Sequence, residues 1–512
     1  MKAVIMKTCV LTVAEMGEAD RLAISRGTPG IDLMRRAGQA CAHAITRRFD
    51  KVNVLVLCGP GNNGGDGFVI AKVLAEEGWA VTVSLLVSPD KLSGDARLAY
   101  EDWIQSAQTP VLGPFDTGLL EGAGLIVDAV FGTGLARDVG SPVMEVIAAA
   151  NASSIPVVSV DIPSGVTGDN GEISGSAFKA SLTVTFFRKK PGHLLFPGRG
   201  RCGEVDVADI GIPDDVIEDL SPQAGENDPE AWIENFPWPR LEAHKYARGH
   251  TVVVSGGVSA TGAARLAALS ALRAGSGLVT VASPASAVIV NAAQSTSVMV
   301  RGFGDLDGFM DVARDARLNS FVIGPGNGVG EATRARVLHL LSLKRSIVLD
   351  ADALTSFAED PKELFDALHE KAVLTPHAGE FSRLFPDLKG VAKHEAARQA
   401  AKHSGAVVVL KGADTVIARP DGQILINANA PATLATAGSG DVLAGLIAGL
   451  MAQGMNGFDA ASAGVWIHGE AACLFGAGLI SEDLPDLVPV VLDLLFDPRQ
   501  SADAAGGRTH DV

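Results

Sequence analysis

Residues 52–67, VNVLVLCGPGNNGGDG, decide the fold class of this chain. An apolar, β-branched run predicts a strand over 52–58, and residues 68–77 return to helical spacing. Between them, Gly59, Gly61 and Gly64 fit the G-x-G-x-x-G spacing, in which glycines let the backbone approach a phosphate at a helix N-terminus. A Gly-rich turn without a ligand has the same spacing. An ordinary dinucleotide dehydrogenase is disfavoured because the next strand ends in Leu86-Val87-Ser88, without the acidic residue that binds a ribose.

The same alternation of apolar strands and helices continues on both sides of this motif. Residues 31–45 have helical spacing, and the further strands expected in the first half are 80–87, 125–131, 156–160, 182–187 and 204–210. Strands that alternate with helices need crossover connections, which predicts a parallel sheet covered on both faces. We therefore expect an N-terminal Rossmann-like α/β/α domain over residues 1–220.

The pattern breaks over residues 213–240, which are acidic and contain five prolines. We predict a linker over 221–240, a second α/β/α domain over 241–498, and a disordered polar tail over 499–512. Strands of the second series are expected at 251–255, 278–282, 321–323, 347–349, 372–374 and 407–410, with a hairpin around Pro420-Asp421-Gly422 and long helices over 441–453 and 458–475.

Composition excludes several classes of protein. The 512 residues carry a net charge of −17, which disfavours a broad nucleic-acid surface because few cations are in excess. Five widely spaced cysteines without a C-x-x-C motif disfavour a disulfide framework or a zinc site. The N-terminus is a poor signal peptide, and the longest apolar run, 442–452, is too short to cross a bilayer. We expect a cytoplasmic enzyme with small-molecule substrates, no nucleic-acid partner and no membrane partner.

Two further strand ends in the first half carry carboxylates before Gly-rich loops: DAVFGTGL at 128–135 and DIPSG at 161–165. Carboxyl ends of parallel strands converge on one crevice. There Asn63, Asp128 and Ser164 offer oxygen atoms to a hard cation, and Asp161 can act as an acid or a base. Each aspartate alone also fits a helix cap or a turn, but three such motifs at three strand ends make that interpretation less favoured.

GPGNNGGDG, DAVFGTGL and DIPSG, in this order, resemble the NAD(P)H-hydrate epimerase domain over about residues 10–212. The resemblance implies a potassium ion near Asn63, Asp128 and Ser164, and a substrate-contacting, catalytic Asp161. It implies that Lys91 is a possible match to a catalytic lysine of the family. The other substrate-binding residues that it implies are Asn62, Asn63, Gly64, Gly65, Asp66, Gly132, Thr133, Gly134, Leu135, Ala136, Arg137 and Asp138.

In the second half, Gly438-Ser439-Gly440-Asp441 opens a long apolar helix. Small residues leave backbone N–H groups open to an anion, and Asp441 can activate a hydroxyl toward a phosphoryl group, although an ordinary N-capping aspartate fits this motif equally well. LKGADT at 410–415, TPHAGE at 375–380 and GPGNG at 324–328 are further strand-end motifs. His377 by itself is more typical of a structural histidine. A P-loop and the kinase signatures HRD and DFG are absent from the sequence.

This set resembles the ribokinase-like fold and, with HKYARGH at 244–250 and the residues 262–281, the ADP-dependent NAD(P)H-hydrate dehydratases over about residues 240–495. The GxGD loop alone is shared with thiazole and pyrimidine kinases. The resemblance implies magnesium, and substrate contacts from Ala263, Gly326, His377 and Asp441. The residues that it implies for ADP are Lys411, Gly412, Ala413, Asp414, Thr415 and Gly440.

Both halves together resemble the bifunctional NAD(P)H-hydrate repair enzymes. The resemblance implies that the first domain interconverts the R and S hydrates, that the second uses ADP to convert the S hydrate to NAD(P)H, AMP and phosphate, and that the chain forms a homo-oligomer. Two alternatives stay open. The second half fits a kinase that phosphorylates a small alcohol with ATP beside a regulatory first half, and the first half fits a non-enzymatic nucleotide-binding or assembly domain.

Overall fold

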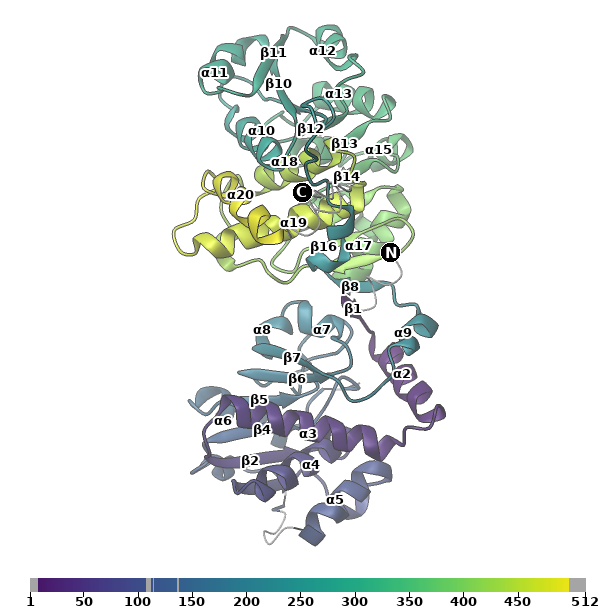
Figure 1. Ribbon diagram of the computed structural model, residues 1–512, viewed down its shortest axis with the longest axis vertical. Coiled ribbons are helices and arrows are strands. Elements are labelled where there is room, and N and C mark those ends of the chain that lie inside the picture. Colours follow the sequence, from purple (N-terminus) through teal and green to yellow (C-terminus); the bar gives the residue numbers. More distant parts are fainter. Residues whose placement is uncertain (1–7, 107–111, 114, 136–137, 497–512) are drawn as a thin grey trace, which may run out of the picture. The chain divides into compact units, whose positions relative to one another are not determined.

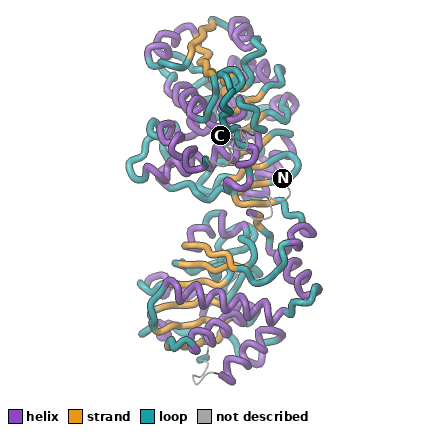
Figure 2. The backbone as a smooth tube through the Cα atoms, in the orientation of Figure 1, coloured by secondary structure: helices purple, strands orange, loops and turns teal. Residues whose placement is uncertain are grey.

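The computed structural model describes residues 8–106, 112–113, 115–135 and 138–496 (Figure 1). The expected tail over 499–512 therefore lies outside the described residues. The chain divides into two compact units, Met1–Gly225 and Glu226–Val512, and each is described by itself. Figure 2 shows strands and helices interleaved in both units, as the alternating sequence pattern predicts.

The first unit contains a parallel sheet with the strand order β3-β2-β4-β5-β6-β7. Its central strands β2, β4 and β5 are the ones that precede the three motifs. The bounds of the strands are β2 Asn53–Cys58, β3 Ala80–Leu85, β4 Leu125–Ala129, β5 Val157–Val160, β6 Leu182–Phe186 and β7 Glu204–Ala208. These bounds agree with the expected strands to within a few residues.

Helices cover both faces of this sheet, because alternate residues of β2 enter two different cores. Val54, Val56 and Cys58 pack with α3, α4 and α5, whereas Leu55 and Leu57 pack with α6. In Figure 1, α3 crosses one face of the strands. The helices of the unit are α2 Val13–Ser25, α3 Gly30–Arg48, α4 Asn62–Glu76, α5 Gly94–Ser106, α6 Ser141–Ala152, α7 Pro191–Leu194, α8 Arg199–Cys202 and α9 Asp215–Leu220. The predicted three-layer α/β/α arrangement is confirmed.

The second unit contains a mainly parallel sheet with the order β17-β16-β15-β14-β13-β12-β9-β10-β11. Strands β16 and β17 are antiparallel and form the hairpin expected around Pro420–Gly422. The strand β11 was not expected from the sequence. The bounds are β9 His250–Val254, β10 Leu278–Pro284, β11 Met299–Phe303, β12 Ser320–Ile323, β13 Ser346–Leu349, β14 Ala372–Leu374, β15 Val407–Leu410, β16 Val416–Ala418 and β17 Ile424–Ile426.

Helices α10 and α18 pack closely against each other in the second unit. A Cβ atom on Gly445 would lie 2.1 Å from the Ala267 carbonyl oxygen, so that only glycine allows the two backbones to approach this closely. The helices are α10 Gly262–Arg273, α11 Val288–Ala293, α12 Leu306–Ala313, α13 Glu331–Ser342, α14 Asp352–Thr355, α15 Pro361–Ala367, α16 Ala378–Leu384, α17 Lys393–Ser404, α18 Ser439–Ala452, α19 Gly457–Phe475 and α20 Leu484–Leu495.

The segment expected to be a linker, 221–240, differs from that expectation. It contains the short strand β8 (Ala224–Glu226), which pairs with β1 (Cys9–Val10), and two 3-10 turns. The Trp232 side chain is 1% exposed and belongs to the apolar core of the second unit. The acidic residues and prolines that suggest a linker describe only the outer side of this segment, whereas Trp232 and Phe236 anchor its inner side.

All five cysteines are free thiols, and four of them are buried. Over the part of the chain that the structure describes, none of the helices has both the length and the apolar character needed to cross a bilayer.

Candidate functional sites

The three motifs of the first unit meet at the carboxyl edge of its sheet, because β2, β4 and β5 are neighbouring parallel strands. The Gly59 N–H donates to the Ala129 carbonyl oxygen at 2.9 Å, which ties the first motif to the second. A Cβ atom on Gly59 would lie 1.8 Å from the Val130 carbonyl oxygen, so the strand end accepts only glycine. The sequence therefore predicted this convergence correctly.

Helix α4 begins earlier than expected, at Asn62 rather than Phe68. Residues Asn62, Asn63, Gly64 and Gly65 consequently form its first turn. The backbone N–H groups of the first three have no partner within the helix and favour an anion, whereas the Gly65 N–H donates to the Gly61 carbonyl at 3.2 Å. Gly64 packs against the Gly59 carbonyl, where a Cβ atom would lie 2.0 Å from the oxygen. The predicted ligand residue Asp66 is buried, and burial raises the pKa of its carboxyl group well above the ordinary value.

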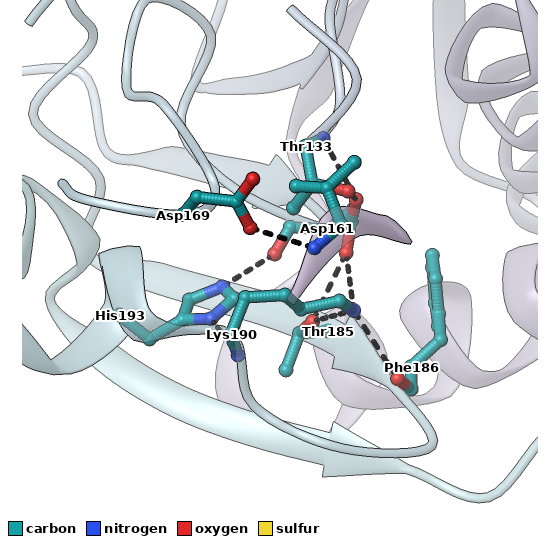
Figure 3. A network of polar contacts seen from close by, with 8 residues as sticks. Thr133, Asp161, Asp169, Thr185, Phe186, Lys190 and His193 are labelled. Atoms are coloured by element: carbon teal, nitrogen blue, oxygen red, sulfur yellow. Dashed lines mark hydrogen bonds and ion pairs between the residues drawn. The ribbon is translucent and has the colours of Figure 1, made fainter. Parts of the chain in front are cut away.

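Asp161 is the centre of a polar network that joins two of the loops (Figure 3). Its Oδ2 accepts hydrogen bonds from the Thr133 N–H at 2.9 Å and from the Thr133 hydroxyl at 2.8 Å. Its Oδ1 accepts from Lys190 Nζ at 2.9 Å and from the Thr185 hydroxyl at 3.0 Å. Asp161 has a φ of +65°, a strained value for a residue other than glycine and one that occurs at functional sites. Burial opposes ionisation, but the Lys190 charge and the Thr133 N–H hold the pKa of Asp161 well below its usual range.

Lys190 and His193 belong to this network and were not identified from the sequence. Lys190 is 1% exposed, and its ammonium group also donates to the Thr185 hydroxyl at 2.9 Å and the Phe186 carbonyl at 3.3 Å. His193 Nδ1 accepts from the Lys190 N–H at 2.9 Å, so Nε2 carries the proton that it donates to the Asp161 carbonyl at 2.8 Å. Burial and the Lys190 charge lower the pKa of His193 to about 4, so its ring is neutral near pH 7.

The lysine that contacts Asp161 is therefore Lys190 and not Lys91, which is exposed in the short turn Pro89–Lys91. Lys190 comes directly after Arg188 and Lys189, so the sequence alone favours a solvated charge run. The Pro-Gly-His that follows Lys190 at the end of a strand is the signal that identifies it in retrospect.

The proposed cation ligands lie beside this network. Asp128 is fully buried; its Oδ1 accepts from the Ser164 hydroxyl at 2.5 Å, and its Oδ2 from the Ser164 N–H at 2.8 Å. Burial raises the pKa of Asp128 to about 6, although its hydrogen bonds oppose this shift. A Cβ atom on Gly132 would lie 3.0 Å from Asp161 Oδ2 and 3.3 Å from Asn63 Oδ1, which places Asn63 next to Asp161. The predicted residues Gly134, Leu135 and Asp138 continue the Thr133 loop, and Ala136 and Arg137 lie outside the described residues.

The second site lies at the carboxyl edge of the other sheet, where α18 begins. Gly438 precedes the helix with a φ of +88°, and Asp441 lies in the first turn. A Cβ atom on Gly440 would lie 3.4 Å from Lys411 Nζ and 3.6 Å from Asp350 Oδ2. Lys411 Nζ and Asp350 Oδ1 form an ion pair at 2.6 Å, and Asp350 is 2% exposed. Burial and the Asp350 charge raise the pKa of Asp441 to about 6, against the Lys411 charge.

The loop that follows Lys411 is closed on itself. The Thr415 hydroxyl donates to the Gly412 carbonyl at 2.8 Å and accepts from the Gly412 N–H at 3.2 Å. The buried Asp414 carboxylate pairs with Lys393 of α17. The Asp414 carboxylate is therefore already engaged by a cation of the protein.

The remaining predicted residues also follow strand ends of the second unit. Gly326, with a φ of +69°, follows β12 and packs beside Ala260, three residues before Ala263 in the first turn of α10. His377 caps α16, since its Nδ1 accepts from the Gly379 N–H at 2.9 Å, while its side chain stays 57% exposed. His377 thus has the structural role of a helix N-cap, and its exposed ring is also accessible to a substrate.

Asp350 and His468 were not identified from the sequence. His468 is buried beside the Ser439 backbone, and its Nε2 has no hydrogen-bond partner among the described residues. Burial lowers the pKa of His468 to about 4, so the ring is neutral beneath the α18 N-terminus.

Two family models match the chain. The "YjeF-related protein N-terminus" matches residues 30–192, and "NAD(P)H-hydrate dehydratase" matches residues 251–487. The bifunctional NAD(P)H-hydrate repair enzyme Nnr of Moorella thermoacetica is 38% identical, over 97% of this chain and 99% of that protein. The enzyme of the same name from Escherichia coli is 33% identical over 88% of each chain.

The chain belongs to the bifunctional NAD(P)H-hydrate repair enzymes. It combines an epimerase domain with a dehydratase domain, as the motifs of its two halves predicted. Among solved structures, an ADP/ATP-dependent NAD(P)H-hydrate dehydratase from Bacillus subtilis is 28% identical and covers 52% of this chain and 96% of its own, with a TM-score of 0.44. A yeast protein, ynu0, is 26% identical and covers 41% of this chain and 93% of its own, with a TM-score of 0.37.

Proposed function

We propose that the Asp161 site interconverts the R and S hydrates of NADH and NADPH, and that the Asp441 site dehydrates the S hydrate at the expense of ADP. The observation that supports this most strongly is that each of the two sheets carries a cluster of charged side chains at its carboxyl edge. One holds the Asp161–Lys190 pair, and the other holds Asp441 beside the Lys411–Asp350 pair.

In the epimerase, the hydroxyl-bearing carbon lies next to the ring nitrogen, whose lone pair can expel the oxygen as water once a proton is supplied. The Lys190 ammonium is the proton donor, and the ionised Asp161 stabilises the positive charge that develops on the ring. Water then adds to the opposite face of the planar carbon and returns a proton to Lys190. Neutral His193 donates its Nε2–H to the Asp161 carbonyl and so keeps the Asp161 carboxylate in position against Lys190.

The contacts of Asn63, Asp128 and Ser164 fit the potassium ion that we propose for this domain. Their candidate ligand atoms are oxygens from an amide, a carboxylate and a hydroxyl, which are the donors that a hard cation prefers. A cation there would neutralise the buried Asp128 charge and favour substrate phosphate at the α4 N-terminus. The first-turn residues Asn62 to Asp66 and the loop Gly132 to Asp138 would bind the nucleotide.

In the dehydratase, hydroxide is a poor leaving group, and transfer of the ADP terminal phosphoryl group to the substrate hydroxyl converts it into phosphate. Asp441, with its raised pKa, accepts the hydroxyl proton. The ring-nitrogen lone pair then expels phosphate, and loss of a proton from the neighbouring ring carbon restores the double bond, which leaves NAD(P)H, AMP and phosphate. The first-turn N–H groups at Gly440 and the Lys411 ammonium stabilise the transferring group.

Magnesium would be held mainly by the ADP phosphates, since the described residues contain no cluster of three or more metal-ligating side chains. Asp350 is the buried carboxylate nearest to Gly440, and we propose that it contacts this ion. ADP would lie on Lys411 to Thr415 and Gly440, with Ala263, Gly326 and His377 toward the hydrated nicotinamide. We also propose a cytoplasmic homo-oligomer, which size measurements on the purified protein test.

The test uses a mixed R and S preparation of NADH hydrate with ADP, magnesium and potassium, and follows the near-ultraviolet absorbance of reduced nicotinamide. The wild type should convert both hydrates and restore the full absorbance, faster than spontaneous epimerisation of the R hydrate allows. With Asp161→Asn, the absorbance should rise only by the amount that the S hydrate accounts for. With Asp441→Asn, the absorbance should not rise, while chromatography should show that the R and S forms still interconvert. Full dehydration by Asp441→Asn would refute its role, unchanged epimerisation by Asp161→Asn would refute the other assignment, and a stable phosphorylated product would favour the kinase alternative.

A further inference from the structure

The second unit contains a cavity of about 400 Å³ on the sheet edge opposite to the dehydratase site. It is lined by the first residues of three parallel strands, His250 of β9, Leu278 of β10 and Met299 of β11. The dehydratase residues instead follow the carboxyl ends of β12, β13, β14 and β15. Since the two edges of a parallel sheet lie a full strand length apart, this cavity is separate from the catalytic site.

Positive charge gathers in this cavity, although residues 226–512 contain 23 basic and 32 acidic side chains. Lys245, Arg301 and Arg317 line it, together with a single carboxylate, Asp315. Asp315 is occupied by Arg317, with Nη2 to Oδ2 at 2.7 Å and Nε to Oδ1 at 3.0 Å. Within the described residues, Lys245 and Arg301 have no carboxylate at ion-pair distance. The cavity therefore presents two uncompensated cations.

His250 does not change this balance. Its backbone N–H donates to the Asn319 side chain at 2.7 Å, and its Nε2 lies 2.7 Å from the Thr280 hydroxyl. Burial and the charge of Arg301 lower the pKa of His250, so the ring is neutral near pH 7. An anion that enters the cavity therefore meets the charges of Lys245 and Arg301, and His250 adds no charge of its own.

The cavity also offers apolar surface. The Tyr246 ring is 58% exposed, with Lys245 Nζ 5.3 Å from its centroid, and Met299 is also exposed. Lys245, Tyr246 and His250 belong to the HKYARGH motif, which the dehydratase site does not use. A Cβ atom on Gly277 would lie 1.8 Å from the Lys245 carbonyl oxygen, so the motif is held tightly against the sheet edge.

We propose that this cavity binds a small phosphate monoester, with the phosphoryl oxygens at Lys245 and Arg301 and the organic part against Tyr246 and Met299. Lysine and arginine donors that lack a carboxylate gain most from a doubly charged phosphate. The aromatic and thioether surface adds contact area for a sugar or a base. This site goes beyond the two catalytic activities and does not depend on them.

The test is calorimetric titration of the full-length protein with ribose 5-phosphate, while saturating ADP and magnesium occupy the nucleotide site. One site per chain is expected. Lys245→Gln/Arg301→Gln should weaken binding by about tenfold or more, because two charge-assisted contacts are lost. The matched control Lys362→Gln/Lys402→Gln removes the same charge from exposed positions on α15 and α17 and should bind like the wild type.

Two further arms separate the ligand chemistry from the catalytic site. Inorganic phosphate should bind more weakly than ribose 5-phosphate, and Tyr246→Ala should reduce that difference. The kcat/KM of dehydration should be unchanged in Lys245→Gln/Arg301→Gln. Equal affinity of the double variant and its control, absence of binding in the wild type, or equal binding of inorganic phosphate and ribose 5-phosphate would each overturn the proposal.

Discussion

Replacing Lys190 by methionine removes the ammonium group of the epimerase site while it keeps most of the side-chain volume. In the wild type that group contacts Asp161 Oδ1 at 2.9 Å, the Thr185 hydroxyl at 2.9 Å and the Phe186 carbonyl at 3.3 Å. Lys190 is 1% exposed, so water cannot replace these contacts. Breaking a buried ion pair from one side typically costs about 3–5 kcal/mol, and we expect a loss of that order in the first unit near pH 7.

The loss should depend on pH in a defined direction. In the wild type, Asp161 has a depressed pKa, so its contribution to stability is present above the ordinary aspartate pKa of about 4 and is lost as the pH falls through the folded-state value. In Lys190→Met, burial dominates and raises the pKa of Asp161, so the folded state takes up a proton. The stability difference between the two proteins should therefore shrink from about pH 8 to about pH 5.

Hydrogen–deuterium exchange of β5 and β6 at several pH values measures this difference locally, and epimerase assays should show a rate loss of roughly a hundredfold to ten-thousandfold. Lys179→Met, at an exposed position of the same unit, is the matched control, and dehydratase activity should persist in both variants. An epimerase rate like that of the wild type, or a pH-independent stability loss, would refute the reasoning.

Three other substitutions separate chemistry from packing in the second unit. Gly440→Ala places a methyl group 3.4 Å from Lys411 Nζ, an ordinary contact distance, so thermal unfolding should change little while dehydration falls by at least about tenfold. Gly445→Ala places it 2.1 Å from a backbone oxygen, so the unit should lose about 1–3 kcal/mol or more in urea unfolding, and wild-type stability would contradict the α10–α18 contact. His468, with a folded pKa of about 4 against an ordinary 6.5, should make unfolding easier as the pH falls through that window, by about 3 kcal/mol in total. His468→Gln should flatten this dependence in urea titrations, and an unchanged slope would exclude His468 as its source.

The sequence predicted which motifs come together, because each motif is local and ends a parallel strand. Asn63, Asp128 and Asp161 lie far apart in the chain, yet the order β2-β4-β5 places their strand ends side by side. The same logic placed Lys411 near Asp441, since β15 and the start of α18 share one sheet edge. The fold class and the convergence of the motifs therefore follow from the strand pattern.

Lys190 and His193 could not be identified from the sequence, because their roles depend on burial in the folded chain. Lys190 and His193 follow β6, a strand without a carboxylate motif, and a lysine within Arg188-Lys189-Lys190 gives no sign that it is buried. The helical start at Asn62 was also missed, because two consecutive glycines have low helix propensity; close contacts with Gly59 and Met34 override it.

The anchored segment at the start of the second unit determines where the chain can be divided into two enzymes. The Asn227 N–H donates to the Ile426 carbonyl at 2.8 Å, its side chain bonds to Asn427 and to the Ser462 carbonyl, and Trp232 fills the core nearby. A dehydratase that began at residue 241 would carry an apolar hole and unpaired amides on its outer strand. Fission of the two activities, in evolution or in the laboratory, has to cut upstream of Asn227, so the acidic stretch travels with the second enzyme rather than between the two.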